Sequence, residues 1–176
     1  MADTRLLVDR IETPLGMLRV VVTPHGELRQ LGWLEEKELP AGVEAVVERD
    51  PFGVSSVLRA YFAGRVGAID ALRVDGAGTP FQRLVWQALR AIPAGETTSY
   101  GELAARIGSP RAVRAVGGAN HVNPIGIVVP CHRVIGKNGG LTGYAGGLDR
   151  KRWLLAHEAR HATGARGKQI ELRALT

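Results

Sequence analysis

The segment VVPCHRV, residues 128–134, contains the only cysteine of the 176-residue chain. A short β-branched run leads into a proline, and the thiol of Cys131 follows with the imidazole of His132 beside it. A cysteine next to a histidine can act as a nucleophile once a base has taken its proton, or it can be a small buried apolar residue. The rest of the sequence has to distinguish these two interpretations.

The composition is ordinary for a globular protein of one large domain or two small ones. One cysteine excludes an internal disulfide framework and any metal site built from several thiolates. It also favours a reducing compartment, so we expect a cytoplasmic protein. The N-terminus lacks the positively charged stretch followed by an apolar stretch that is typical of a secretory signal peptide. No apolar run approaches the ~20 residues of a membrane span.

Charge divides the chain into two unequal halves. Residues 1–78 carry nine Lys or Arg against twelve Asp or Glu, whereas residues 79–176 carry fourteen against five. A basic half suggests an acidic partner, most simply nucleic acid, although a solvated arginine-rich surface would give the same pattern. The charge changes sign at the Asp75-Gly76-Ala77-Gly78 joint, where we place a domain boundary.

Residues 1–78 have the pattern of a small α/β domain with a mostly antiparallel sheet. Strands are predicted at 6–8, 18–22 and 28–34, because β-rich runs alternate there with Pro-Gly turns. Residues 35–50 are predicted to form a loop, with at most a short helix. A helix around residues 54–62 should stop at Gly64, and a further strand is predicted over 68–74.

Residues 79–160 are predicted to form a mainly helical domain, which makes the whole chain a two-domain α+β protein. Thr79 can cap a helix whose apolar stripe includes Leu84, and Ser99 with Glu102 has the form of a capping box. A further helix should open at Ser109-Pro110 and stop before Asn123, so two short helices meet in a helix-turn-helix. The last helix is expected at 149–158 with Trp153 buried, followed by a basic tail over 161–176.

The second helix of this pair presents arginines and unusually small residues. Gly117 and Gly118 lie in its interior, where a glycine costs roughly 1 kcal/mol, and Arg111 and Arg114 lie on one side. Such a surface lets another backbone come close, which can be a nucleic-acid strand or a packed helix. Residues 136–147 then hold six glycines around Tyr144, in a loop without phosphate-binding spacing.

A reactive Cys131 would need a base, and that base would need an acceptor on its other nitrogen. His132 is the nearest base. Glu158 is the best candidate acceptor, because a carboxylate at the C-terminal end of an apolar helix meets the unfavourable end of the helix dipole and needs a partner.

These residues resemble the O6-alkylguanine-DNA alkyltransferases, also called methylated-DNA–protein-cysteine methyltransferases. The resemblance covers nearly all of residues 79–158 without a gap, and it is weaker around Thr13-Pro14-Leu15-Gly16 and Tyr61-Phe62-Ala63-Gly64. The segments that carry it are Ser99-Tyr100, Arg114-Ala115-Val116-Gly117-Gly118-Ala119, Asn123-Pro124, Pro130-Cys131-His132-Arg133-Val134, Gly143-Tyr144-Ala145-Gly146-Gly147-Leu148 and Trp153-Leu154-Leu155-Ala156-His157-Glu158.

The resemblance implies that Cys131 accepts the alkyl group of O6-alkylguanine once and irreversibly. His132 would be its base through a water, with Glu158 orienting the imidazole, and Tyr100 would donate a proton towards the leaving guanine. Asn123 would tie the recognition helix to the cysteine segment. The implied DNA and base contacts are Ser99, Arg114 (which would fill the gap left by the extruded nucleotide), Ala115, Gly117, Gly118, Val129, Val134, Tyr144 and Gly146.

The resemblance also implies a monomer that docks its helix-turn-helix in the minor groove of alkylated double-stranded DNA, with O4-alkylthymine as a second candidate lesion. No cofactor is expected, because the lesion supplies the alkyl group, and no zinc is expected, because no cysteine precedes Cys131. Asn120-His121 departs from the larger apolar residue and the basic residue of several relatives, which predicts a weaker groove contact there.

Three other functions fit parts of the sequence. A non-catalytic alkyltransferase-like protein would bind the lesion, but such relatives replace the cysteine that this chain keeps at Cys131. A helix-turn-helix transcription factor explains the basic half but not the Pro-Cys-His-Arg segment or the loop around Tyr144. A thiol hydrolase would turn over repeatedly and would not prefer DNA.

Overall fold

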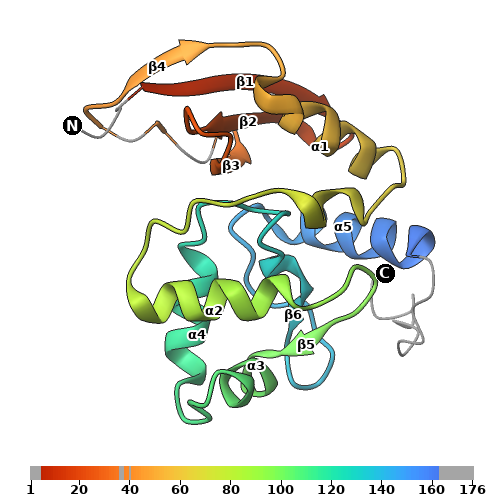
Figure 1. Ribbon diagram of the computed structural model, residues 1–176. Helices are drawn as coiled ribbons and strands as arrows, with labels where there is room; N and C mark the ends of the chain where they lie inside the picture. The colour runs from red at the N-terminus through yellow and green to blue at the C-terminus, as the bar shows by residue number, and fades with distance from the viewer. Residues whose placement is uncertain (1–4, 36–37, 40, 163–176) are drawn as a thin grey trace.

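The computed structural model describes residues 5–35, 38–39 and 41–162 and has the predicted two-domain α+β architecture (Figure 1). A four-stranded sheet with one packed helix forms the N-terminal domain, and helices with a two-stranded ladder form the C-terminal domain. In Figure 1 the sheet lies as a layer over the helical part. The boundary after residue 78 stays a prediction, in a joint where residues 75–79 form no helix or strand.

The sheet has the strand order β3-β2-β1-β4. Its elements are β1 (Arg5–Thr13), β2 (Gly16–Val22), β3 (Leu28–Trp33) and β4 (Glu44–Val47). The first three strands pair antiparallel, whereas β4 runs parallel to β1. The expected loop over 35–50 is therefore wrong at β4, which forms because the edge of β1 offers backbone groups that need partners.

The remaining N-terminal elements are η1 (Pro51–Gly53), α1 (Val54–Phe62) and η2 (Ala68–Ala71). Helix α1 ends as predicted, since Gly64 follows it with a φ of 109° that favours glycine. The strand predicted over 68–74 is wrong. Its first half forms η2, with Ile69 buried, and only Val74 pairs with a strand residue, Leu28.

Helix α2 (Pro80–Arg90) begins with a capping box between Thr79 and Gln82. Its buried face differs from the predicted stripe. Leu84 is 43% exposed, while Trp86 is buried and its indole N–H donates to the carbonyl of Ala119 at 3.0 Å. The tryptophan anchors α2 to the helix of residues 113–121, so Trp86 rather than the predicted Leu84 faces the core.

The predicted helix-turn-helix consists of α3 (Tyr100–Arg106) and α4 (Val113–His121). Ser99 and Glu102 form the expected capping box at the start of α3. Helix α4 begins three residues later than predicted, because residues 110–112 form a turn. Helix α5 (Leu148–His161) is longer than predicted at both ends, and Trp153 is only half-buried; residues 163–176 of the predicted tail lie outside the described residues.

One hydrophobic core joins the sheet to the helices, from Val20 and Leu31 to Leu89 and Leu154. A backbone contact reinforces this junction. The N–H of Leu31 in β3 donates to the carbonyl of Pro124 at 3.0 Å, and the carbonyl of Leu31 accepts from Gly126 at 3.0 Å. The sheet edge therefore holds the segment that leads to Cys131. No helix among the described residues is long and apolar enough to cross a membrane.

Candidate active site

Cys131 begins η3 (Cys131–Arg133), a single turn between the buried Pro130 and the short strand β6 (Val134–Ile135). The residue is half-buried and opens on a cavity of about 120 Å³, which favours the nucleophile over a buried apolar residue. The lining residues are Tyr100, Gly117, Asn120, His121, Cys131, Gly143, Tyr144 and Ala145. The thiol is therefore reachable from outside without a large movement of the chain.

A tight coil, residues 123–130, presents Cys131 to this cavity. The side chain of Asn123 spans the coil, because its Nδ2 donates to the carbonyl of Val129 at 2.8 Å and its Oδ1 accepts from the N–H of Ile125 at 3.0 Å. Ile127 lies in the left-handed region at φ 70°, which is unusual for a β-branched residue. The coil is thus a constrained support fixed from the end of α4 by one asparagine.

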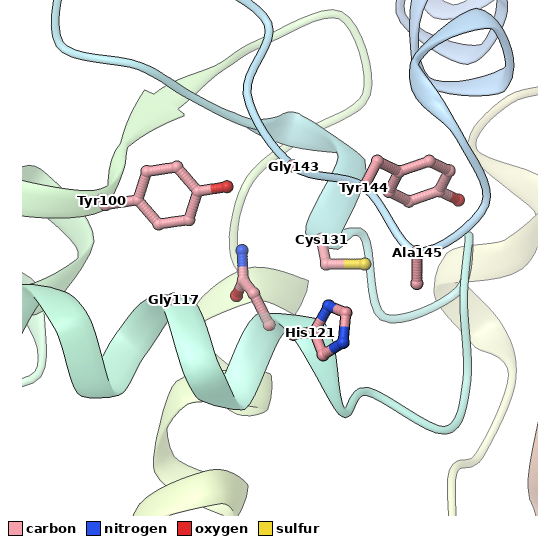
Figure 2. A pocket seen from close by; sticks show the side chains of 8 residues that line it. Tyr100, Gly117, His121, Cys131, Gly143, Tyr144 and Ala145 are labelled. Carbon is pink, nitrogen blue, oxygen red and sulfur yellow. The ribbon is translucent and has the colours of Figure 1, made fainter.

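Tyr100 reaches the cavity through a strand pairing that the sequence did not predict. The ladder joins β5 (Thr98–Ser99) to β6 in parallel, and this places the start of α3 beside the cysteine turn. Figure 2 shows Tyr100 and Tyr144 on opposite sides of Cys131. Burial raises the pKa of the Tyr100 phenol, so the hydroxyl keeps its proton near neutral pH.

His132 is fully buried and points to Glu158 rather than to solvent. Its Nε2 lies 2.8 Å from Oε1 of Glu158, so we assign the Nε2–H tautomer that donates to the carboxylate. Among the described residues, Nδ1 has no hydrogen-bond partner. Burial lowers the pKa of the imidazole, and the charges of Arg133 and Lys151 add to this, so the pKa is low although Glu158 raises it. A neutral imidazole with a free lone pair on Nδ1 is the form that a general base requires.

Glu158 accepts more hydrogen bonds than the predicted one from His132. Arg133 donates from Nε to Oε2 at 2.9 Å and from Nη2 to Oε1 at 2.8 Å, and the Tyr61 hydroxyl donates to Oε1 at 2.8 Å. Burial raises the pKa of the carboxyl, but the hydrogen bonds from His132 and Arg133 and the guanidinium charge hold it well below its usual range. Glu158 is therefore an anion in the core, paired with one cation.

Sequence reasoning missed the roles of Arg133 and Tyr61. Arg133 was noted only as part of the resemblance, and Tyr61 lies in α1 of the other domain. A signal did exist for the arginine: a carboxylate as buried as Glu158 needs a cation, since burying an unpaired charge is unfavourable by many kcal/mol. Nothing local to Tyr61 indicates its partner, 97 residues away.

A buried lysine joins two segments that are distant in the sequence, the strand after Cys131 and the glycine-rich loop. The Nζ of Lys151 in α5 donates to the carbonyl of Val134 at 2.6 Å and to that of Thr142 at 2.9 Å. Burial lowers the pKa of this amine to about 8. The lysine thereby joins the strand after the cysteine turn to the glycine-rich loop.

Gly146 shows why the loop around Tyr144 needs small residues. A Cβ at position 146 would lie 2.6 Å from the Tyr144 ring and 2.7 Å from the indole nitrogen of Trp33. Arg150 packs over the same indole at 4.2 Å and donates to the carbonyls of Leu15 and Gly146 at 3.1 and 3.4 Å. The N-terminal domain therefore forms part of the support for this loop.

The predicted DNA contacts on α4 lie on an exposed surface. Arg114, Ala115 and Gly118 are exposed, and Gly117 is half-buried at the cavity. A Cβ on either glycine would meet no atom within 4 Å, so the small residues do not serve the packing of a neighbouring helix. The open space in front of them is available to a partner.

Other predicted contacts are not brought to the cavity. Val129 and Val134 are buried, and Val129 lines a separate cavity of about 260 Å³ beside α2. Ser99 is half-buried and caps α3. Among the described residues, no three His, Cys, Asp or Glu side chains gather as metal ligands would.

The comparisons with known proteins agree with this geometry. Residues 80–160 match the model of the family described as 6-O-methylguanine DNA methyltransferase, DNA binding domain. A methylated-DNA–protein-cysteine methyltransferase of Salmonella typhimurium is 53% identical over 88% of this chain and 96% of its own length. The chain belongs to the methylated-DNA–protein-cysteine methyltransferase family.

Other members of the methyltransferase family extend the match. The relative from Mycolicibacterium paratuberculosis is 48% identical over 86% of this chain and 92% of its own length. Among solved structures, Mycobacterium tuberculosis OGT in complex with DNA is 45% identical, with a TM-score of 0.78 over 89% of this chain and 94% of that one. Both domains are therefore shared with the family.

Proposed function

We propose that this chain repairs DNA by transferring an alkyl group from O6-alkylguanine to Cys131 in a single, irreversible step. Family membership over both domains and the presence of the cysteine support this function. One observation carries the proposal. The half-buried Cys131 opens on a cavity, and the residue that follows it, His132, has its Nε2 hydrogen-bonded to the buried carboxylate of Glu158.

The proposed transfer begins with the proton of the thiol. A water would carry it from Sγ of Cys131 to Nδ1 of His132, while Glu158 holds Nε2–H and stabilises the imidazolium that forms. The thiolate attacks the alkyl carbon, so the S–C bond forms as the bond from that carbon to O6 breaks. Tyr100 donates a proton to the leaving guanine ring, and the phenol then regains a proton from solvent.

The alkylated base has to leave the duplex before this chemistry can occur. We propose that the exposed surface of α4 enters the minor groove and that Arg114 fills the gap in the stack. Flipping costs a few kcal/mol, less for a poorly paired damaged base, and a side chain in the stack offsets part of this. The other contacts would go mostly to phosphates, because no sequence has to be read.

We further propose that one copy of the chain is sufficient, since a single chain supplies every residue of the site. Cys131 has to stay reduced to act as a nucleophile, which fits work in the cytoplasm.

Incubation with a duplex that contains radiolabelled O6-methylguanine tests the proposal. After digestion, we expect the label on Cys131 at one equivalent per chain. Cys131→Ala is the control and should bind the duplex without accepting the label. Binding by the intact protein without transfer would favour the non-catalytic alkyltransferase-like function, and sustained turnover would contradict the single-use mechanism.

A further inference from the structure

Asn120 has an unusual place in the cavity beside Cys131. Asn120 lies in the last turn of α4, is only 8% exposed, and is one of the residues that line the cavity. Neither Oδ1 nor Nδ2 of its carboxamide makes a hydrogen bond of regular geometry within the part of the chain that the structure describes. The sequence predicted a weaker groove contact at this position, but the residue is buried in the cavity wall instead.

An unsatisfied amide of this kind is uncommon in a folded protein. Most buried side-chain polar groups have a hydrogen-bond partner, and one that lacks it destabilises the fold. The amide of Asn120 also lies beside the Tyr100 hydroxyl, whose pKa burial raises and this amide slightly lowers. A buried polar group whose only neighbour of this kind is a weak contact with the proton donor is explained if a stronger partner arrives with the substrate.

We propose that Asn120 binds the extruded base through a pair of hydrogen bonds that select guanine. Its Oδ1 would accept from the exocyclic amine, and its Nδ2 would donate to the adjoining ring nitrogen. The inference rests on the proposed alkyl transfer, and it adds a specificity-determining residue to that site.

The chemistry of the two candidate lesions gives the selectivity. In O6-alkylguanine the 2-amino group is a donor, and the ring nitrogens on either side of it are acceptors, so a donor and an acceptor lie next to each other. A carboxamide presents the complementary pair. O4-alkylthymine has no exocyclic amine, and it presents two adjacent acceptors there. Against thymine, Oδ1 of Asn120 would face another acceptor and would remain unpaired, which is unfavourable.

His121, the neighbouring cavity residue, does not offer the same recognition. It is exposed and follows Asn120 directly on α4, so its ring can stay hydrated whether or not a base is bound. A polar group that water already satisfies gains little from a base, whereas a buried unpaired amide gains a full hydrogen bond. This difference makes His121 a matched control.

The experiment compares two methylated bases that differ only in the exocyclic amine: O6-methylguanine and O6-methylhypoxanthine. Each is placed in a single-stranded oligonucleotide, where neither base has to leave a duplex. In the intact protein, the methyl group should pass to Cys131 roughly ten- to a hundredfold faster from O6-methylguanine than from O6-methylhypoxanthine. Asn120→Leu, which has a similar shape, should reduce this ratio about tenfold by slowing the guanine reaction alone.

Two further variants make the comparison decisive. His121→Leu should keep the ratio of the intact protein. If the leucine variant at position 120 does not fold, as judged by circular dichroism, Asn120→Ala gives the same comparison with the same expected ratio. An unchanged ratio in a folded Asn120 variant that still transfers methyl groups would overturn the inference, as would loss of the ratio in His121→Leu. Absence of transfer from either base by the intact protein would instead refute the proposed function.

Discussion

The hydroxyl of Tyr61 donates to Oε1 of Glu158 at 2.8 Å, across the junction between the two domains. The same oxygen accepts from Nε2 of His132 at 2.8 Å, and all three residues are fully buried. A tyrosine of the N-terminal domain thus shares an acceptor atom with the histidine beside Cys131. The N-terminal domain therefore belongs to the network that orients the candidate base.

Tyr61→Phe should weaken both stability and transfer. The change leaves a buried carboxylate with one donor fewer, which we expect to lower the free energy of unfolding by about 1.5–3 kcal/mol. The rate of methyl transfer should fall several-fold, because Glu158 holds His132 less firmly. Urea unfolding and single-turnover kinetics measure the two effects. Ser55→Ala removes another buried hydroxyl of α1, bonded to Asp9 at 2.6 Å, and should lower stability without slowing transfer. Equal transfer by Tyr61→Phe and the intact protein would contradict a role in orientation.

Glu158→Gln should separate charge pairing from catalysis. Arg133 would become an uncompensated buried cation, and we expect the free energy of unfolding to fall by about 3–5 kcal/mol. Transfer should slow by about two orders of magnitude, because the imidazole loses its anionic acceptor. Adding Arg133→Met should restore part of the stability but none of the rate. A double variant as active as the intact protein would show that Glu158 serves the fold alone.

Transfer and stability should respond differently to mild acid. An ordinary histidine is half protonated at pH 6.5, but the pKa of His132 is lower in the folded protein, so its base form and the transfer rate should persist at that pH. The unfolded chain takes up this proton first, so the free energy of unfolding should decrease as the pH falls below 6.5. The stability that the lowered pKa of Glu158 contributes is present above pH 4.5 and is lost as the pH falls below it. Single-turnover rates and urea unfolding over this range provide the test, and a rate halved at pH 6.5 would argue against it.

Gly118→Ala should change stability and DNA binding in opposite directions. The new methyl group meets no atom within 4 Å, and alanine is favoured over glycine in a helix by up to about 1 kcal/mol, so stability should rise. Binding to duplex DNA should weaken, because the methyl group occupies the space in front of α4. Thermal unfolding and fluorescence anisotropy measure these changes. Unaltered binding, even for Gly118→Leu, would place the DNA on another surface.

Arg114→Ala should slow repair in a duplex more than reaction with the free alkylated base. Only the duplex reaction requires an extruded nucleotide and a side chain to fill the stack. Arg111→Ala, on the turn before α4, is the matched control and should affect duplex binding mainly through salt-dependent phosphate contact. Equal losses on both substrates for Arg114→Ala would refute a role in base flipping.

Local signals in the sequence predicted much of this fold. The predicted cap at Thr79 and the predicted capping box at Ser99 marked helix starts correctly, because a cap depends on residues only a few positions apart. Helix α1 and its stop at Gly64 were predicted from the helical spacing of apolar residues and from the glycine, which are local signals as well. The errors lie where partners are distant: β4 forms on the edge of β1, and residues 68–71 become η2 rather than a strand.

The residues of the site likewise fall into those that local sequence signals could predict and those that only the folded structure reveals. Cys131 and His132 are neighbours in the sequence and could be recognised together, whereas the pairing with Glu158 was predicted from the helix dipole and from the family resemblance. Tyr61 and Lys151 act through contacts between segments far apart in the chain, and no periodicity reports such contacts. The unpaired amide of Asn120 could be identified only once the cavity was known, since burial is a property of the folded chain.

Arg150 lies between the turn that precedes β2 and the loop that flanks the thiol. A Cβ on Gly16, whose φ is 116°, would lie 3.3 Å from its guanidinium, and the same side chain bonds the carbonyl of Gly146. Sensitivity to substitution therefore does not simply decline with distance from Cys131. We expect substitutions at Gly16, Arg150 and Gly146 to reduce activity. A surface turn of the sheet domain would then be as sensitive to substitution as a position in the active site.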